Sequence, residues 1–250
     1  MVIPETLPIG AIDDGKTLRD VYASDQAMYP VPLPYERLQS WVAACPELSI
    51  CFRDTTACDA TWTACGLIIV LPLRRIYWEK LLDGRLKEVD VDAGSMFPDW
   101  HSRDGSGGEL EEVEVGLHVY HVERGSTEGW EPSRATPEGP GSRRKGFAEF
   151  ALEEVVRRVK NSRWRIVGMS ALTATPAGKR TFEKMGFIST GYRELFVAEN
   201  KARADASEKG NAQVEMICLN PGDDREIASA AAGRTVISMS EMAVKFVGIR

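Results

Sequence analysis

Apolar residues along the chain follow two different spacings. Recurrence every three or four positions, typical of amphipathic helices, marks Thr17–Met28, Leu38–Cys45 and Leu73–Leu82. Apolar and β-branched runs, typical of strands, mark Leu48–Arg53, Thr61–Leu71, Val113–Val122, Arg165–Ala171, Ser189–Val197 and Gln213–Leu219. Because proline lacks a backbone N–H, Pro72 is expected to end the second of these strands.

A further helix is predicted to begin inside the segment Arg143-Arg144-Lys145-Gly146-Phe147-Ala148. Two adjacent apolar rows follow Gly146, namely Phe147, Phe150, Ala151 and Val155, and Ala148, Leu152, Val156 and Val159. The first turn of a helix carries N–H groups without intrahelical partners and a partial positive charge. A glycine there lets a ligand approach the backbone closely. The segment therefore predicts a seat for a phosphate or pyrophosphate, with a solvated basic loop as the alternative.

The last predicted helix begins at Thr175-Pro176. Threonine is a favoured N-cap, and proline suits the first helical position. The helix is expected to run to Lys184 or Met185, with Gly186 as its left-handed C-terminal cap.

This order of helices and strands predicts an α/β (α+β) fold, with a mixed, mostly antiparallel central sheet flanked by helices in a single domain. The domain is expected to span residues 17–219, after an irregular segment 1–16. Residues 84–112 and 123–142 are polar and are interpreted as inserts. Residues 220–250 show little pattern and are expected to form a C-terminal extension.

Composition narrows the function. The net charge of −6 argues against a general nucleic-acid binder, so any anion site must be local. The five cysteines form no C-x-x-C pair, and the three histidines add no zinc spacing, so no metal is expected. The N-terminus shows no leader pattern, and the longest apolar run, around Leu67–Leu71, is too short for a bilayer. We expect a cytoplasmic protein without a membrane partner, and a nuclear location is also compatible.

Two motifs in this order resemble those of the GNAT superfamily of acyl-CoA-dependent N-acyltransferases. The family's phosphate motif, Gln/Arg-x-x-Gly-x-Gly/Ala at the start of a central helix, is matched by Arg143–Ala148. A second family pattern, Asn-x-x-Ala-x-x-x-Tyr-x-Lys-x-Gly-Phe, is matched at its end by Lys184-Met185-Gly186-Phe187. The resemblance covers roughly Thr17–Leu219 and implies the family's fold.

The second motif departs from the family pattern at two positions. Thr175 replaces the family's asparagine, which removes one amide from the coenzyme site. Phe182 replaces the tyrosine that commonly protonates the departing thiolate, and phenylalanine has no proton to give.

The resemblance implies acetyl-CoA as co-substrate, and an acetyl group passed to a primary amine through a tetrahedral intermediate. It places the diphosphate on Arg143, Arg144, Lys145, Gly146, Phe147 and Ala148, with Thr175 and Phe182 beside the coenzyme. It places the pantetheine along the strand that carries Leu117, His118 and Val119, with the N–H of Val119 as a candidate oxyanion donor.

Family members often use a glutamate on this strand as the base, and Glu114 fits that position. Glu112 is the second choice, and a solvated acidic edge is the alternative for both. His118 could also serve, because its usual pKa is about 6.5, or it could be a polar strand residue facing solvent. Tyr192 or Tyr120 could replace the missing acid, or could simply pack in the core.

The acceptor is expected to be an amine on a small molecule or peptide, and a homodimer is one option for the assembly. An acidic rim for a cationic amine, or only a solubilising loop, could be formed by residues in or beside the first insert, namely Asp90, Asp92, Asp99, Asp104 and the four glutamates near Glu109. Met96, Phe97 and Trp100 could cover the acceptor or anchor that loop. The second candidate function is an acyl-CoA-binding protein of the same fold without catalysis. A nucleotide-hydrolysing protein is excluded, since the chain has no G-x-x-x-x-G-K-[ST] loop.

Overall fold

A computed structural model describes residues 5–9, 15–28, 33–53, 64–100, 112–125, 145–199, 214–219 and 234–247. Its centre is an eight-stranded sheet with the order β1-β2-β3-β4-β5-β8-β6-β7. The strands are β1 (Glu5–Pro8), β2 (Ser49–Arg53), β3 (Ala64–Arg74), β4 (Val113–Arg124), β5 (Trp164–Thr173), β6 (Ile188–Glu199), β7 (Val214–Leu219) and β8 (Arg234–Phe246). Strands β4 and β5 are parallel, and the other neighbouring strands are antiparallel. The predicted mixed, mostly antiparallel sheet is confirmed.

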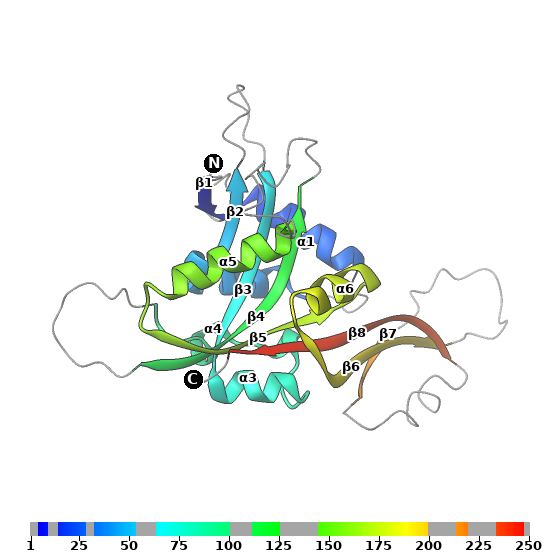
Figure 1. The fold of residues 1–250 in the computed structure, drawn as a ribbon. Coiled ribbons are helices and arrows are strands. Elements are labelled where there is room, and N and C mark those ends of the chain that lie inside the picture. The colour runs from blue at the N-terminus through cyan, green and yellow to red at the C-terminus, as the bar shows by residue number, and fades with distance from the viewer. Residues whose placement is uncertain are drawn as a thin grey trace, which may run out of the picture.

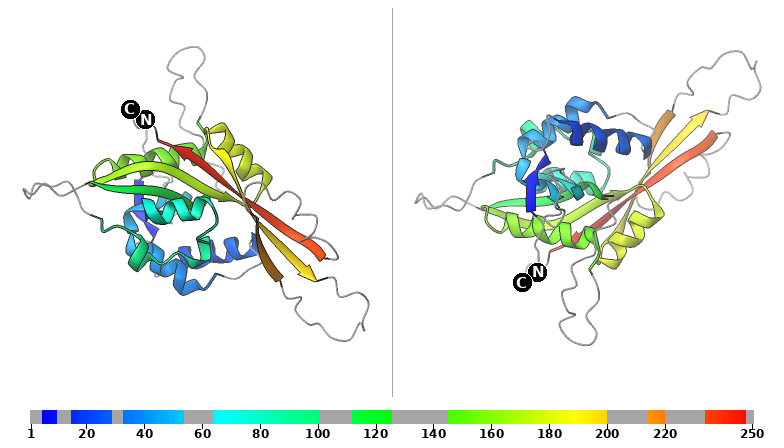
Figure 2. Two further views of the ribbon diagram at one scale, coloured as in Figure 1. Left: turned by 90° about the horizontal axis from the view of Figure 1, so that it is seen from below. Right: turned by 90° about the horizontal axis from the view of Figure 1, so that it is seen from above.

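Helices cover both faces of this sheet (Figures 1 and 2). One face carries α5 (Phe147–Val159) and α6 (Pro176–Lys184). The other carries α1 (Lys16–Met28), α2 (Tyr35–Ala44) and α3 (Arg75–Leu82), followed by a 3-10 turn η3 (Glu88–Asp90) and the short helix α4 (Ala93–Met96). Because β4 lies between the two layers, its residues from Val115 to His121 are all buried.

The helix boundaries follow the sequence signals closely. Helix α5 begins directly after Gly146, and Phe147, Ala151, Leu152, Val155 and Val159 of its two apolar rows are buried. The side chain of Thr175 caps α6 by accepting the Gly178 N–H at 3.0 Å, and Pro176 takes the first helical position. Gly186 has φ +88, the left-handed conformation expected after the helix. The predicted N- and C-terminal signals of α6 are therefore confirmed.

The sequence analysis expected Pro72 to end its strand, and this expectation is wrong. Strand β3 continues to Arg74, and Pro72 pairs with Leu117 of β4. The pairing of β3 with β2 has already ended at Ile69 and Ser49. Beyond that point β3 lies beside β4 alone, and a proline is tolerated where one side of a strand makes no ladder hydrogen bonds.

Both ends of the chain contribute strands that the sequence did not indicate. Strand β1 lies in the segment expected to be irregular, and β8 lies within the expected extension 220–250. Strand β8 pairs with both β5 and β6 in the interior of the sheet. The sheet therefore includes residues outside the predicted boundaries 17–219.

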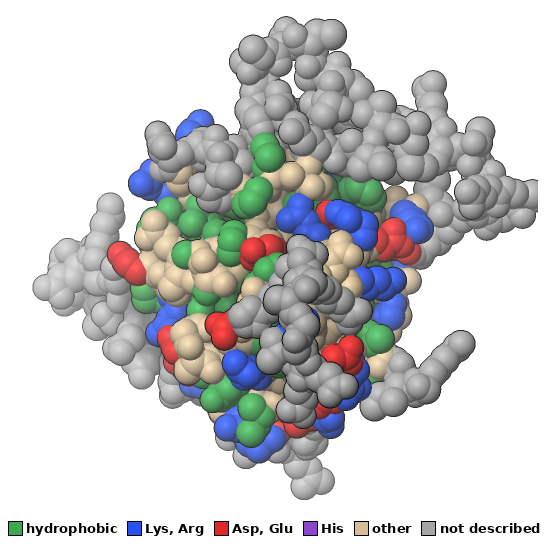
Figure 3. All heavy atoms as spheres, turned by 90° about the vertical axis from the view of Figure 1, so that its left-hand side faces the viewer, with side chains coloured by type: hydrophobic (Ala, Val, Ile, Leu, Met, Phe, Trp, Pro, Cys, Tyr) green, Lys and Arg blue, Asp and Glu red, His purple; other side chains and the backbone are tan. Residues whose placement is uncertain are grey.

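Charged side chains of both signs are interspersed over the face shown in Figure 3. None of the helices in the described part of the chain combines the length and hydropathy needed to cross a bilayer. Within the same residues, no group of three or more His, Cys, Asp or Glu side chains is arranged to hold a metal ion.

Candidate active site

The parallel strands β4 and β5 separate partway along their length. Their pairing ends at Val119 and Ala171. From there β4 continues to Arg124 beside β3, and β5 continues to Thr173 beside β8. Strand β4 also carries an extra residue, Tyr120, opposite the step from Ile69 to Val70 on β3. Such a bulge bends a strand and increases its local twist, so it accounts for the divergence visible in Figure 1.

The start of α5 combines a buried anchor with an open backbone. Phe147 is buried, and its ring packs edge-on against Phe52 at 5.5 Å between centroids. Gly146, the N-cap residue, is exposed, and a Cβ placed on it would meet nothing within 4 Å. No side chain of the described residues caps this helix end. A ligand could therefore reach the first turn at Gly146 without displacing protein atoms.

Of the three predicted basic residues, only Lys145 lies within the described residues; Arg143 and Arg144 lie outside them. The Lys145 ammonium is 2.6 Å from a carboxylate oxygen of Glu153, one helical turn and a half into α5. This hydrogen bond raises the pKa of Lys145, with a further contribution from the negative charge. The lysine is therefore charged, and a bound phosphate would compete with Glu153 for it.

The two residues that depart from the family pattern both hold α6 in place. Thr175 uses its hydroxyl oxygen as the helix cap. Phe182 is buried, with its ring 5.0 Å from that of Phe187 in an edge-on arrangement. Neither role requires a ligand.

The predicted pantetheine residues lie where β4 is still paired. Leu117, His118 and Val119 stand opposite Met169, Ser170 and Ala171 of β5. Val119 is the last paired residue, so it marks the point at which the two strands part. Leu117 and Val119 are buried.

Glu114 lies at the other end of β4. Its carboxylate is 3.1 Å from the guanidinium of Arg75 and also binds the side chain of Arg165. Val119 is five positions further along the strand, a distance of about 16 Å at ~3.3 Å per residue. The structure thus places the predicted base in an ion-pair group away from the parting of the strands.

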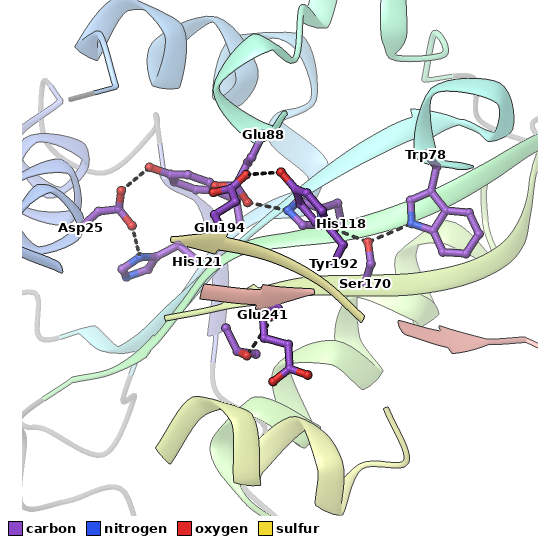
Figure 4. Close-up of polar contacts among 11 residues, drawn as sticks. Asp25, Trp78, Glu88, His118, His121, Ser170, Tyr192, Glu194 and Glu241 are labelled. Atoms are coloured by element: carbon purple, nitrogen blue, oxygen red, sulfur yellow. Dashed lines mark hydrogen bonds and ion pairs between the residues drawn. The ribbon is translucent and has the colours of Figure 1, made fainter. Parts of the chain in front are cut away.

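His118 is fully buried and does not face solvent, so that alternative is wrong. Its Nε2 is 2.5 Å from Glu88 Oε2, and its Nδ1 is 2.9 Å from Ser170 Oγ. Trp78 Nε1 donates to the same Ser170 oxygen at 2.9 Å. Burial lowers the pKa of His118 to about 3. Figure 4 shows this row of groups running from Trp78 to Glu88.

Two buried glutamates complete this region, and the sequence had indicated neither. Glu88 comes from η3, and its pKa is raised well above the usual range by burial and then by the charge of Asp25. Glu194 comes from β6 and accepts a hydrogen bond from the hydroxyl of Tyr192 at 2.9 Å. Burial, and then the charge of Glu88, raise the pKa of Glu194 to about 7.

A third carboxylate, Asp25 of α1, lies beside the same group. It accepts a hydrogen bond from the Tyr120 hydroxyl at 2.6 Å and is 3.6 Å from His121 Nδ1. We call the following set the acid–base cluster: Asp25, Trp78, Glu88, His118, Tyr120, His121, Ser170, Tyr192 and Glu194 (Figure 4). It brings together the predicted His118, Tyr120 and Tyr192, and it leaves Glu114 apart.

Aromatic residues of the first insert anchor it to the core. Phe97 is buried, and Trp100 stacks edge-on against Trp164 of β5 with 4.8 Å between centroids. Asp92 caps α4 by accepting the Ser95 N–H at 3.0 Å. At the other end, the Trp41 indole donates to the Val91 carbonyl at 2.9 Å. Residues 88–100 are therefore held to the core at both ends, which keeps Glu88 against His118.

No protein-family model matches the chain, and no curated protein matches it. It is similar to the structure of Arabidopsis thaliana NAA60 in complex with a bisubstrate analogue, at 13% identity and a TM-score of 0.47, over 98% of this chain and 99% of that one. The same plant protein in complex with acetyl-CoA gives a TM-score of 0.45 at 13% identity, over 97% and 99% of the two chains.

The structure of the mosquito protein named arylalkylamine N-acetyltransferase like 5b is similar at 10% identity and a TM-score of 0.39, over 85% of this chain and 81% of that one. Identities this low leave the substrate and the mechanism to be argued from the chain's own residues.

Proposed function

We propose that the protein is an acyl-CoA-dependent N-acyltransferase that moves an acetyl group from acetyl-CoA to a primary amine of a small molecule or peptide. One observation carries this proposal. The strand β4 leaves its parallel neighbour β5 after Val119, and the chain then enters α5 within the segment that resembles a coenzyme A phosphate motif.

The diphosphate would bind at the first turn of α5. The N–H groups and partial positive charge of a helix start attract anions, and open space at Gly146 allows close approach. Arg143, Arg144 and Lys145 would add charge, while Phe147 and Ala148 would supply backbone donors. The pantetheine would follow β4 towards Val119, with Leu117 and His118 beneath it and α6, with Thr175 and Phe182, alongside.

The reaction would be a direct attack of nitrogen on the thioester carbonyl. An alkyl ammonium has a pKa of about 10.4 and must lose a proton before it can attack. The N–H of Val119 would stabilise the oxyanion of the tetrahedral intermediate. Glu114, His118 and Tyr192 are the sequence-based candidates for proton transfer. Of these, His118 and Tyr192 belong to the acid–base cluster, and Glu114 does not.

A second candidate function is coenzyme binding without catalysis. Phe182 favours it, because a buried ring without a hydroxyl occupies the position of the usual acid. However, a coenzyme thiol has a pKa of about 8.5, so its thiolate can leave near neutral pH without an acid.

The binding step can be tested with Gly146→Val. We expect acetyl-CoA to raise the Tm of the wild type by several degrees and that of Gly146→Val hardly at all, because the new side chain fills the space that the diphosphate needs. The unliganded variant should lose only the stability that a poorer N-cap costs, about 1 kcal/mol, since a Cβ at Gly146 meets nothing within 4 Å. Gly94→Val, at an exposed position of the insert, is the matched control and should keep the full shift. No acetyl-CoA shift in the wild type would rule out both candidate functions.

The transfer step separates the two candidates. We expect the wild type to release free thiol from acetyl-CoA when an amine from a panel of arylalkylamines, polyamines and peptides is added. Coenzyme binding without thiol release across the panel would favour the binding protein.

A further inference from the structure

We propose that Glu194 is the base that removes the proton from the acceptor amine, and that Glu88 and His118 are positioning residues that set its proton affinity. This inference rests on the proposed function. The supporting observation is that Glu88, His118 and Glu194 lie close together on the face of the sheet opposite α5, at the point where β4 and β5 part.

The hydrogen bonds of the cluster allow two placements of protons, which differ in whether Glu88 or His118 carries the proton between them. Trp78 Nε1 can only donate, so Ser170 Oγ accepts from it. A hydroxyl oxygen can accept twice, so it can also accept from His118 Nδ1–H. The other ring nitrogen, Nε2, then has a lone pair facing Glu88 Oε2 at 2.5 Å. In this first placement, a protonated Glu88 donates to a neutral His118. In the second placement, Ser170 donates its hydroxyl proton to Nδ1, and His118 Nε2–H donates to an ionised Glu88.

Burial favours the first placement. Glu88 and His118 are both buried, and a charged form of either would lose its hydration. Burial raises the pKa of Glu88 and lowers that of His118, so the proton resides on the carboxyl group. Glu88 is therefore neutral near pH 7, although it is a carboxylic acid.

Glu194 differs from Glu88 in its neighbours. It is bound by the Tyr192 hydroxyl, which stabilises the ionised form, and the positive charge of Lys87 acts in the same direction. Its pKa of about 7 lets it exchange a proton at neutral pH, as a general base must. Two neighbouring carboxyl groups with different proton affinities are a common basis for acid–base assignments in active sites.

The position of the pair suits an amine that arrives from the α1–α3 face. His118 and Ser170 are paired across β4 and β5 one step before Val119 and Ala171, where the strands part. Glu88 reaches this point from η3, and Glu194 reaches it from β6 (Figure 4). The coenzyme would approach from the α5 side, so the thioester would lie between coenzyme and base.

The proton balance of the step is complete. Glu194 takes one proton from the ammonium group, and the freed lone pair forms the C–N bond. The C–S bond then breaks, and the thiolate takes the second proton from the nitrogen of the new amide. The proton on Glu194 returns to solvent, so the products are the amide, the coenzyme thiol and one proton.

Other titratable groups contribute to the pH response of this region. Asp25 on α1 and His121 on β4 act on Glu88, with opposite signs. Lys87 and Tyr192 act on Glu194, and Tyr120 is bound to Asp25. A pH profile of the wild type alone would therefore not identify the base, and variants are needed.

The test is the pH profile of kcat/KM, with acetyl-CoA and the best amine of the panel, for the full-length protein and three variants. We expect Glu194→Gln to lower kcat/KM by at least about 100-fold and to abolish the acid limb near pH 7, with an unchanged Tm shift by acetyl-CoA. Glu88→Gln should keep the acid limb near pH 7, because its amide can donate to His118 Nε2 as the protonated carboxyl group does. Glu79→Gln, an exposed carboxylate of α3, is the control and should keep the wild-type profile.

The outcomes are distinguishable. If Glu194→Gln keeps the rate and the acid limb while the wild type releases thiol, Glu194 is not the base and the proposed function stands. If the wild type releases no thiol with any amine, the proposed function and this inference both fail. If Glu194→Gln does not fold, the position of the acid limb in Glu88→Gln decides, and a limb that moves to lower pH would show that Glu88 is ionised and would overturn this assignment of protons.

Discussion

Glu114 and Glu194 place the same carboxyl group in two opposite environments. Glu114, at the start of β4, has a side chain that is 29% exposed and lies between the guanidinium groups of Arg75 and Arg165. Glu194 is 4% exposed, and its neighbours are a tyrosine hydroxyl and a second carboxyl group. The first charge is compensated and hydrated. The negative charge of Glu194 is neither compensated nor hydrated, so the protonated form of Glu194 is favoured over the ionised form.

The comparison shows that the position of a glutamate along a strand does not decide whether it can act as a base. Glu114 has the expected place in the sequence, but two cations balance its negative charge. Glu194 and Glu88 come from elements far apart in the chain, and burial raises the pKa of both, that of Glu194 to about 7. The predictions below change one region at a time.

The largest effect is expected from Gly116→Ala, which breaks the buried region. A Cβ on Gly116 would lie 2.0 Å from Cγ of Trp78, a ring that is 2% exposed and cannot move aside freely. We expect a loss of about 3 kcal/mol or more in the free energy of unfolding, measured in urea. Displacing Trp78 would also remove its hydrogen bond to Ser170, so the acid limb of the activity profile should move.

Gly94→Ala is the matched control for this prediction. Its Cβ would come no closer than 3.7 Å to Asp92 Oδ2, so the free energy of unfolding should change by less than about 1 kcal/mol. Equal stability of the two variants would mean that Trp78 does not pack over Gly116 as described.

The second prediction concerns how the free energy of unfolding depends on pH in the wild type and in Glu194→Gln. Burial raises the pKa of Glu194 from 4.5 to about 7, so between these values the native state holds a proton that the unfolded state has released. Unfolding free energy therefore falls as pH rises through this window, by about 3 kcal/mol in total. Glutamine does not titrate, so Glu194→Gln should gain up to that amount over the wild type between pH 4.5 and pH 8.

Urea unfolding at pH 5, 6, 7 and 8 measures this difference. His118 acts with the opposite sign, because burial lowers its pKa to about 3 and its contribution to stability is lost as pH falls below 6.5. That loss is common to both proteins and cancels in their difference. A difference that stays constant with pH would show that Glu194 titrates as an ordinary exposed carboxylate.

Local patterns were enough to predict most of the fold. The caps of α6, the two apolar rows of α5 and the strand at Val113–Val122 depend on neighbours in sequence, and each is confirmed. Strand β8 could not be predicted in this way, since both of its alternating faces mix apolar with polar residues. Its place between β5 and β6 depends on pairing with strands distant in sequence.

The candidate site was harder to predict from the sequence, because it too is formed by residues that are distant in the chain. Glu88 lies in an acidic insert, so the sequence indicates a solvated residue. Its burial against His118 depends on the anchoring of residues 88–100 to the core. Glu194 did carry a signal, because it shares one face of β6 with Tyr192 and Phe196, both buried. A charged residue alternating with aromatic ones on a buried strand face deserves weight as a candidate titrating group.

The smallest effect on the free energy of unfolding is expected from a change at Glu114, the more exposed of the two glutamates. Glu114→Gln removes one partner from an ion-pair group in which Arg75 keeps Glu79 at 2.6 Å. Partly exposed ion pairs contribute little, so the free energy of unfolding should fall by about 0.5 kcal/mol. The loss should shrink in 1 M NaCl, where the screening length is ~3 Å. Urea unfolding at low and high salt measures it. A salt-independent loss above about 2 kcal/mol would mean that Glu114 is structurally essential.

A fall in kcat/KM as large as that of Glu194→Gln, with the same loss of the acid limb, would instead identify Glu114, at the start of β4, as the base.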